Sequence, residues 1–289
     1  MLTGTPSRTA FGAARHRAAH QLLEHGRIFC DPLALRILGE KAEDVIRDAE
    51  DHPLKSRVRI FIAARHRFTE DAIAAAVHRG LRQVVVLGAG LDTYAYRTPF
   101  ADRLRIFEVD HPDTQAWKRE CLAQAGIVAP QGLTFVGVNF ETQKLSERLA
   151  AAGVNPGEQT FFVWLGVVPY LTDAALWSTL GFIATFSRGS QVTFDYSEPF
   201  DALPPESRAY AEQRAAQVAR LGEPWLNFFD PKQLHEKLRA HGITEIEDLG
   251  PRQIMARFFP ERESMVPNRG GHVIRATTSG KITGDTKTD

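Results

Sequence analysis

The chain has 289 residues, of which 43% are hydrophobic and 24% are charged, enough for one large α/β domain with a well-buried core. Its 35 Lys and Arg residues balance 35 Asp and Glu residues, so bulk electrostatics favour neither nucleic acid nor a membrane surface as a partner. Cys30 and Cys121 form no CxxC pattern, the N-terminus lacks a signal-peptide core, and no apolar run approaches the about 20 residues of a membrane span. These features predict a cytoplasmic protein with two free thiols, and they leave the oligomeric state open.

The first eighty residues predict helices and no convincing strand. Residues 7–26 are rich in Ala and Arg, and residues 31–50 and 54–79 are helical in pattern as well. Pro32 and Pro53 mark helix starts, because proline is tolerated in the first turn of a helix. A mostly helical segment therefore precedes the sheet.

After this segment, the pattern changes to strands that alternate with helices. Runs of apolar residues predict buried strands at 83–88, 104–110, 133–139, 159–166 and 190–197. The helices predicted between them span 113–126, 142–153 and 172–186. This alternation is typical of a doubly wound parallel sheet.

The alternation breaks after the fifth strand. Residues 199–224 predict a helical insertion, and residues 230–242 predict a further helix with Asp230 as its N-cap. Two final strands, 243–249 and 271–278, are predicted to pair antiparallel, and a solvated tail follows them.

A glycine turn, LGAGLDT (87–93), follows the first predicted strand. A strand, a glycine turn and a helix start form a nucleotide-binding element, although many parallel sheets carry a glycine there for packing alone. The dinucleotide fingerprint GxGxxG would need glycine where Thr93 stands. Asp92 places a negative charge where a pyrophosphate would otherwise meet the helix N-terminus. This favours a ligand without phosphates, such as S-adenosylmethionine, unless Asp92 simply caps the helix.

Polar residues also end the next two strands. Asp110 lies twenty residues after Gly90, a spacing at which an acid can accept hydrogen bonds from ribose hydroxyls. Asn139 could recognise the edge of an adenine, and Phe140 could cover its face. Each residue alone could be an ordinary loop residue, but together they follow successive strands at their carboxyl ends. Their joint placement predicts a nucleoside site.

Five segments resemble the leucine carboxyl methyltransferase family: SRTA (7–10), ARHRFTEDA (64–72), LGAGLDTYAYR (87–97), FEVDHPDTQAWK (107–118) and WLGVVPYLT (164–172). The chain is most similar to the bacterial branch of that family, S-adenosylmethionine-dependent methyltransferases with mostly unassigned substrates. The similarity extends from about residue 7 to about residue 278.

The resemblance implies an α/β class I methyltransferase fold, a Rossmann-like doubly wound sheet of seven strands, the last one antiparallel, with a helical cap. Residues 1–80 would form the N-terminal part of the cap and residues 81–278 the domain that binds S-adenosyl-L-methionine. Residues 199–228 would be a cap insertion, and residues 279–289 a flexible tail. No metal is implied.

Carried over residue by residue, the resemblance implies seven cofactor-binding residues. They are Arg8 and Arg65 at the methionine carboxylate, Gly88 and Gly90 along the methionine and ribose, Asp110 at the ribose hydroxyls, and Asn139 and Phe140 at the adenine. Asn139 departs from the usual aspartate, but an amide oxygen can still accept from the adenine amine. Leu165 stands where a glutamate is common, which puts in doubt any transfer of the phosphatase-methylating activity.

Methyl transfer is an in-line displacement to which a protein contributes mainly proximity and alignment. A carboxylate acceptor is already ionised, whereas a hydroxyl acceptor needs a general base. Five residues near predicted strand ends could serve as that base: His111, Tyr170, Asp195, Tyr196 and Glu198. Each is more often an ordinary packing or loop residue, so the catalytic residue stays unknown, with Tyr170 and Tyr196 retained as candidates.

The insertion ends in three aromatic residues, Trp225, Phe228 and Phe229, beside a helix rich in Ala and Arg. They suit an acceptor with an apolar body and an anionic end, unless they only fasten the cap to the sheet. We therefore predict O-methylation of a carboxylate or hydroxyl on a small molecule, or of a terminal carboxylate. A nicotinamide-dinucleotide-dependent oxidoreductase and a catalytically silent cofactor-binding or regulatory protein are the alternatives.

Other sites find less support in the sequence. His16 and His20 have the spacing of a zinc-binding HExxH helix, but Arg17 stands where the glutamate should be. No GxSxG or GxxxxGK[ST] motif occurs. The arginines of the first helix lack the interleaved aromatic residues of a nucleic-acid-binding face.

Overall fold

The computed structural model describes residues 7–50, 53–139 and 142–280. A seven-stranded sheet with the order β3-β2-β1-β4-β5-β7-β6 forms its centre. The strands are β1 (Gln83–Leu87), β2 (Arg105–Asp110), β3 (Leu133–Gly137), β4 (Thr160–Trp164), β5 (Gln191–Ser197), β6 (Ile243–Leu249) and β7 (Gly271–Thr278). β1 to β5 pair in parallel, and β7 runs antiparallel to both of its neighbours. The predicted seven strands with an antiparallel last strand are confirmed.

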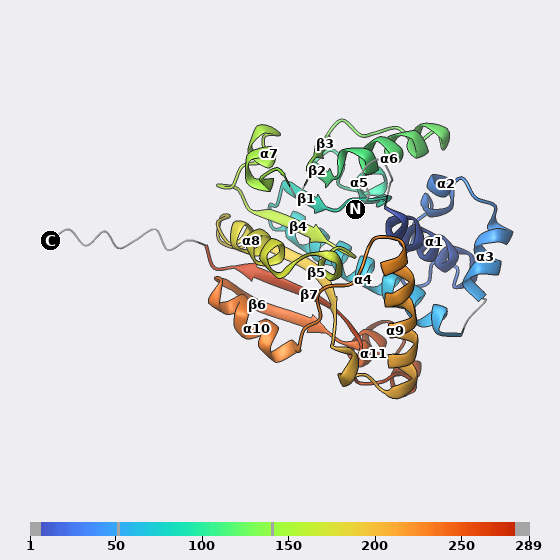
Figure 1. Cartoon of the computed structure of the whole chain (residues 1–289). Coiled ribbons are helices and arrows are strands. Elements are labelled where there is room, and N and C mark those ends of the chain that lie inside the picture. Colours follow the sequence, from blue (N-terminus) through green and yellow to red (C-terminus); the bar gives the residue numbers. More distant parts are fainter. Residues whose placement is uncertain (1–6, 51–52, 140–141, 281–289) are drawn as a thin grey trace.

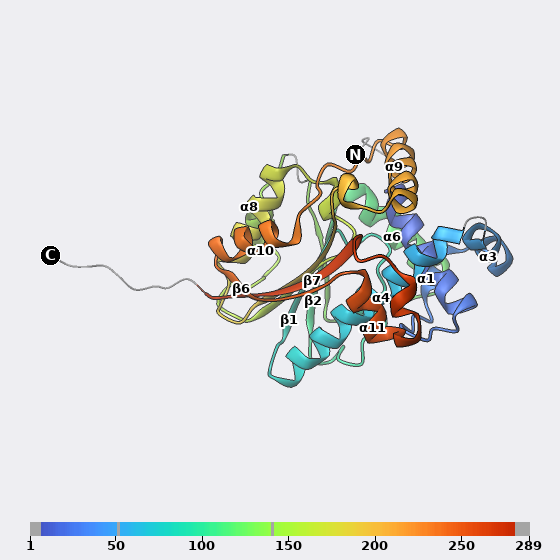
Figure 2. The ribbon, with the colours of Figure 1, turned by 90° about the horizontal axis from the view of Figure 1, so that it is seen from below.

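Helices cover both faces of the sheet (Figures 1 and 2). One face carries α4 (Pro53–His78), α6 (Pro112–Gln124) and α11 (Pro251–Phe258), and the other carries α7 (Leu145–Ala151), α8 (Asp173–Ile183) and α10 (Pro231–Ala240). Val84 and Val86 of β1 belong to the core beneath α4, whereas Val85 and Leu87 belong to the core beneath α8. Because both faces are buried, the strand appears in the sequence as an unbroken apolar run.

The cap combines segments from both ends of the chain. Helices α1 (Arg8–Leu23), α2 (Ala34–Leu38) and α3 (Ala42–Glu50) pack together at one end of the molecule, with α9 (Pro205–Arg220) close to them in Figure 1. The N–H of Thr9 donates to Glu223 Oε2 at 3.1 Å, which ties the start of α1 to the segment that follows α9. Three shorter helices, α5 (Tyr94–Arg97), η1 (Val168–Tyr170) and η2 (Phe200–Ala202), lie in the loops.

Three local differences from the predicted elements have physical causes. Residues 31–50 form two helices instead of one, because Gly39 ends α2 with φ at 67°. Helix α11 and η3 (Pro260–Met265) form in a stretch for which no element was predicted, and Ile254 of α11 packs between α4 and β7. The C-terminal half of α4, including Ile73 and Val77, packs on β1, so α4 belongs to the sheet layer as well as to the cap.

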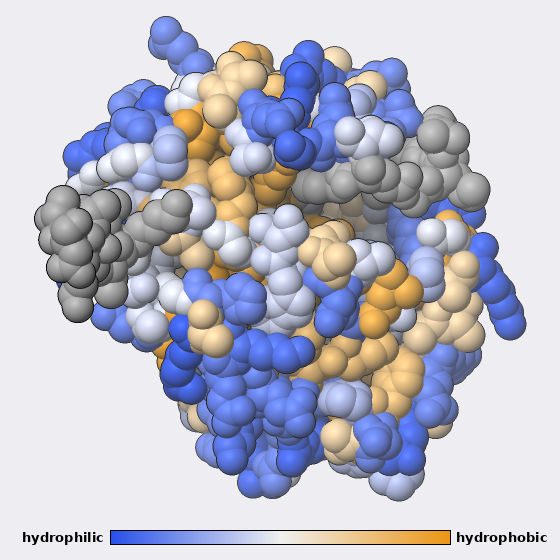
Figure 3. Space-filling model, turned by 60° about the vertical axis from the view of Figure 1, so that its left-hand side comes forward, coloured by the Kyte–Doolittle hydropathy of each residue, from blue (hydrophilic) through white to orange (hydrophobic). Residues whose placement is uncertain are grey.

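Hydrophilic residues dominate the face of the molecule in Figure 3, with hydrophobic residues in strips between them. In the part of the chain that the structure describes, no helix has the length and apolarity to cross a membrane.

Candidate cofactor and acceptor site

A cavity of about 1100 Å³ lies where the parallel strands end. Its walls come from the residues that follow β1 to β5, together with side chains of α1, α4, α9 and α11. Ligands of open α/β sheets bind at this edge of the sheet. The cavity brings together six of the seven predicted cofactor residues: Arg8, Arg65, Gly88, Gly90, Asp110 and Asn139. Phe140 lies outside the described residues.

Hydrogen bonds to the end of β2 hold the glycine turn. The N–H of Gly88 donates to the Val109 carbonyl at 2.8 Å, and the N–H of Gly90 donates to Asp110 at 2.7 Å. The other Asp110 oxygen accepts from the N–H of His111 at 2.7 Å. Burial raises the pKa of Asp110, while these two backbone hydrogen bonds act in the opposite direction. Because each carboxylate oxygen has a second lone pair, Asp110 can also accept from ribose hydroxyls.

The two glycines of the turn are explained by backbone conformation and packing. Gly88 and Gly90 have φ of 67° and 43°, a region that side chains disfavour. A Cβ on Gly88 would lie 2.4 Å from Val167, and a Cβ on Gly90 would lie 2.9 Å from Ala10. Of the two explanations for the glycines, a ligand or packing alone, these contacts support packing, because protein atoms already fill this space. The glycines alone therefore give no evidence for a ligand.

Arg65 of α4 forms a buried ion pair with Asp195 of β5. Arg65 Nη1 lies 2.7 Å from Asp195 Oδ2, and the N–H of Gly166 donates to Asp195 Oδ1 at 2.5 Å. Asp195 thus joins α4, β5 and the loop after β4. Arg65 Nε is buried and has no hydrogen-bond partner, so the guanidinium keeps a donor for another anion. A cofactor carboxylate fits that donor.

Arg8 and Asn139 lie in more open parts of the cavity wall. Arg8 is exposed at the first position of α1, where the Ser7 hydroxyl caps the helix by accepting from the N–H of Ala10 at 3.1 Å. Asn139 follows β3, and its N–H donates to Gln143 Oε1 at 3.0 Å.

Asp92 directly precedes Thr93, the N-cap of α5, and its side chain binds the first N–H of that helix. Its Oδ1 accepts from the N–H of Tyr94 at 2.7 Å, and its Oδ2 lies 3.6 Å from His66 Nδ1. Burial lowers the pKa of His66 well below its usual value, and Arg17, Arg65 and Arg97 lower it further. The imidazole is therefore neutral near pH 7.

A buried network that the sequence analysis missed supports the other side of the turn. Arg17 Nη2 donates to the Leu91 carbonyl at 2.6 Å, and Arg17 Nε lies 3.3 Å from Asp31. Asp31 also accepts from the Thr93 hydroxyl at 2.7 Å. Thr93 therefore anchors the turn where a dinucleotide-binding loop would have a third glycine. The signal in the sequence was an arginine between buried alanines of the first helix.

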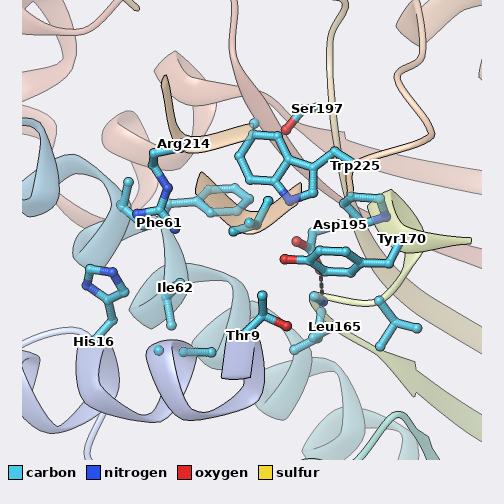
Figure 4. Close-up of a pocket in the computed structure, with 18 of the residues that line it drawn as sticks. Thr9, His16, Phe61, Ile62, Leu165, Tyr170, Asp195, Ser197, Arg214 and Trp225 are labelled. Carbon is cyan, nitrogen blue, oxygen red and sulfur yellow. Dashed lines mark hydrogen bonds between the residues drawn. The ribbon is translucent and has the colours of Figure 1, made fainter. Parts of the chain in front are cut away.

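Tyr170 of η1 lines the cavity, and Figure 4 shows its ring between Asp195 and Thr9. Burial raises its pKa, while hydrogen bonds with Trp225 and Thr9 act in the opposite direction. Near pH 7 the hydroxyl keeps its proton. Tyr170 is thus a poor base.

Tyr196 faces away from the cavity. Its hydroxyl donates to Asp248 at 2.5 Å, and its ring stacks on His272 with the centroids 4.8 Å apart. Consecutive side chains of a strand point to opposite faces, so Asp195 and Ser197 line the cavity while Tyr196 packs in the core. This placement removes the structural basis for Tyr196 as a catalytic candidate.

The remaining candidate bases already have partners within the protein. His111 Nδ1 caps α6 by accepting from the N–H of Asp113 at 3.3 Å. Glu198 pairs with Arg269 and accepts from the N–H of Gly270 at 2.8 Å. Both carboxylates at the end of β5, Asp195 and Glu198, therefore have structural roles.

The region in Figure 4 has mostly apolar walls from segments that lie far apart in the sequence. Phe61 and Ile62 come from α4, Leu165 follows β4, and Trp225 follows α9. Leu165, which stands at the position of the family glutamate, packs against two apolar clusters. One lies between α4 and β1, and the other lies between α4, α11 and β7.

Only one of the three aromatic residues after the insertion lines the cavity. Phe229 packs edge-to-face on Tyr196 with the centroids 6.2 Å apart, and Phe228 packs on Phe200 with the centroids 4.6 Å apart. Phe228 and Phe229 therefore fasten the insertion to the rest of the fold, and Trp225 alone faces the cavity.

His16 and His20 point to different places. His16 lines the cavity, whereas His20 is buried with its Nδ1 3.1 Å from Glu24. Among the described residues, no group of three His, Cys, Asp or Glu side chains is arranged to hold a metal ion.

Comparison with known proteins agrees with this fold. Residues 10–184 match the model of the leucine carboxyl methyltransferase family. A Bacillus subtilis protein, provisionally named an S-adenosyl-L-methionine-dependent methyltransferase, is 34% identical over 206 residues, which are 69% of this chain and 66% of that protein. A Frankia alni protein with the same provisional description is 34% identical over 185 residues, 62% of this chain and 64% of its own. The chain thus spans less than two thirds of the length of these relatives.

One solved structure, a DUF574 family protein from Streptomyces avermitilis, aligns with a TM-score of 0.55 and covers 91% of this chain and 96% of its own. At 13% identity it shows a shared fold alone. The family match, by contrast, covers more than half of the chain and includes Arg65, the glycine turn, Asp110 and Tyr170. It ends before β5 and α9, so part of the cavity wall lies beyond it. The chain belongs to the leucine carboxyl methyltransferase family, the assignment that its sequence motifs predicted.

Proposed function

We propose that this protein transfers the methyl group of S-adenosylmethionine to a carboxylate oxygen of a small acid with an apolar body. Family membership and the curated relatives support the reaction class and the cofactor. The cavity volume of about 1100 Å³ supports two ligands side by side, because single ligand sites commonly measure about 300–1,000 Å³.

The residues at the strand ends fit this cofactor. Arg8 and the unpaired Nε of Arg65 would bind its methionine carboxylate, Asp110 its ribose hydroxyls, and Asn139 its adenine. When bound, the cofactor supplies an electrophilic methyl group on a cationic sulfur. The protein's task is then to align the acceptor oxygen with that group and to exclude water.

The observation that carries the choice of acceptor is the state of the candidate bases in the cavity. Burial raises the pKa of Tyr170. The pKa of His16 is lowered to about 3, mainly by burial and next by the charge of Arg214. Asp195 and Glu198 are engaged in ion pairs. Tyr170 therefore keeps its proton near pH 7, His16 is a weak base, and both carboxylates are held by cationic partners. A carboxylate acceptor needs no proton removed, which favours it over a hydroxyl.

The test uses tritiated cofactor and matched carboxylic acids, phenols and amines with the same apolar bodies. Product is then treated with base, which releases methyl esters as volatile methanol and leaves methyl ethers and N-methyl groups intact. We expect base-labile label from the acids. Label that stays base-stable would refute the carboxylate assignment and require a general base.

Calorimetric titration separates the alternatives. We expect S-adenosylmethionine and S-adenosylhomocysteine to bind with one site per chain and NAD to show no saturable binding. Preferential binding of NAD would favour an oxidoreductase. Tight cofactor binding without label transfer to any member of the acceptor set would favour a silent binding protein.

A further inference from the structure

We propose that Arg214 of α9 recognises a second anionic group of the acceptor, distinct from the carboxylate that takes the methyl group. This inference rests on the proposed function in one respect, that the acceptor binds in the same cavity as the cofactor. It specifies the acceptor as an apolar molecule with two acidic groups.

Arg214 reaches into the cavity from the cap. In Figure 4 its side chain extends from α9 toward Phe61 and His16, while Tyr170 and Leu165 lie on the other side of the drawn region. Burial has the largest effect on the pKa of His16, which it lowers, and on the pKa of Tyr170, which it raises. The charge of Arg214 lowers both pKa values. The guanidinium therefore acts on groups of two different walls.

The charge of Arg214 is uncompensated among the described residues. Its guanidinium carbon lies 6.0 Å from the centroid of the Tyr210 ring. No carboxylate oxygen of the described residues lies within 4.0 Å of its guanidinium nitrogens. The nearby acids have other partners: Glu223 accepts from Thr9, and Asp48 pairs with Lys55 at 3.2 Å. A partly buried cation beside apolar walls is costly unless an anion joins it.

The other cavity arginines differ from Arg214 in this respect. Four of them are paired with a carboxylate: Arg15 with Glu40, Arg17 with Asp31, Arg65 with Asp195, and Arg269 with Glu198. Arg8 is placed for the cofactor, and Arg57 is exposed to solvent. Arg214 is thus the partly buried arginine of the wall whose charge the protein leaves for a ligand.

The pKa of His16 also reflects the positive charge at this end of the cavity. Its pKa is lowered to about 3, first by burial and then by the charges of Arg214, Lys55 and Arg59, while the charge of Asp48 acts in the opposite direction. Beyond the effect of burial, three cations lower this pKa and one carboxylate raises it, which indicates a positive potential around His16. This part of the cavity favours an anion and disfavours an amine.

Arg214 is set apart from the glycine turn. Ala10 of α1 contacts that turn, whereas Arg214 acts on His16, six residues further along α1 or about 9 Å along the helix axis. An arginine bound to the reacting carboxylate would also compete for the lone pairs that attack the methyl group. Both points assign Arg214 to a separate anionic group, with the apolar body between Phe61, Ile62 and Trp225.

The test measures binding of 8-anilinonaphthalene-1-sulfonate by fluorescence, with S-adenosylhomocysteine saturating the cofactor end. Its neutral counterpart, N-phenyl-1-naphthylamine, has the same aromatic body without the sulfonate. We expect Arg214→Gln to weaken sulfonate binding about tenfold to a hundredfold, the effect of one charge-assisted hydrogen bond, and to leave binding of the neutral probe unchanged. Arg214→Lys keeps the charge and should lose less than tenfold.

Arg220→Gln is the matched control, because Arg220 is exposed on the same helix and lies outside the large cavity. Unchanged affinity for S-adenosylhomocysteine shows that each variant is folded. The proposal is overturned if Arg214→Gln and Arg220→Gln bind the sulfonate alike, or if the wild type does not bind it saturably. It is also overturned if S-adenosylhomocysteine displaces the sulfonate, since the anion would then occupy the cofactor's own site. Failure of the methyl-ester assay alone would leave this binding result intact, so the two proposals fail separately.

Discussion

The two ends of the cavity are built differently. At the glycine turn the polar groups have partners within the protein: Gly90 binds Asp110, Asp195 binds both Arg65 and Gly166, and Thr93 binds Asp31. At the cap end, α9 fully buries Val218 alone, and Arg214 has no anionic partner among the described residues. One end is preorganised on strand ends, whereas the other, as we propose, is completed by a ligand. Substitutions at the cap end can therefore change what it binds without disturbing the hydrogen bonds of the glycine turn.

The largest expected effect comes from adding a methyl group inside the rigid end. Gly88→Ala would place Cβ 2.4 Å from Val167 at a φ of 67°. The unfavourable φ alone costs about 1–2 kcal/mol, and the clash moves the loop after β4. We expect loss of measurable cofactor binding by calorimetry and lower stability in urea.

Gly181→Ala is the control for that change, because Gly181 lies inside α8 and an added Cβ would meet no atom within 4 Å apart from the nearby backbone of its own helix. It should be neutral or stabilising by up to about 1 kcal/mol. Equal behaviour of the two variants would contradict the described packing of the glycine turn. Adding Val167→Ala to the first variant should restore part of the binding.

The buried ion pair should give the next largest effect. Asp195→Asn leaves Arg65 buried without its anion, a change that typically costs about 3–5 kcal/mol. Asp71→Asn breaks the exposed pair with Arg67 and should cost no more than about 1 kcal/mol. Urea denaturation of both variants measures the difference. A small effect of Asp195→Asn would mean that Arg65 is not held as described.

Asp110→Ala should weaken cofactor binding about tenfold to a hundredfold, because hydrogen bonds to a charged group contribute about 1.5–3 kcal/mol. The exposed Asp102 supplies the control, Asp102→Ala. Calorimetry with S-adenosylhomocysteine makes the measurement. Unchanged affinity in a folded Asp110 variant would remove the ribose assignment.

The smallest expected effect is a change in pH dependence at the cap end. The pKa of His16 falls from 6.5 in the unfolded chain to about 3 in the folded protein. Between these values the unfolded chain binds a proton that the folded protein does not, so stability falls as the pH falls through this window. His16→Gln should therefore lose less stability than the wild type between about pH 7 and about pH 5. Parallel pH profiles would show that His16 titrates normally.

The sequence was most informative where the pattern is local. Both faces of the parallel strands are buried, so their apolar runs predicted five strands, and residues at their ends predicted where Asp110 and Asn139 meet. Because successive side chains of a strand point to opposite faces, the sequence could also have shown that Asp195 and Tyr196 do not face the same site. The pairing of Arg65 with Asp195 joins residues 130 positions apart, and no local pattern encodes such a contact. Arg214 is likewise one of several arginines in its segment until the fold places it in the cavity.

Hydrogen exchange of the full chain, with and without saturating S-adenosylhomocysteine, tests the central claim most directly. The cofactor should slow exchange at the glycine turn, residues 88–92, at Asp110 and His111, and along α1, which carries Arg8 and contacts the turn through Ala10. Exchange in α9 should stay nearly unchanged until an acceptor binds. Protection confined to α9, or exchange at the turn and α1 that is the same with and without cofactor, would contradict the division of the cavity into a cofactor end and an acceptor end.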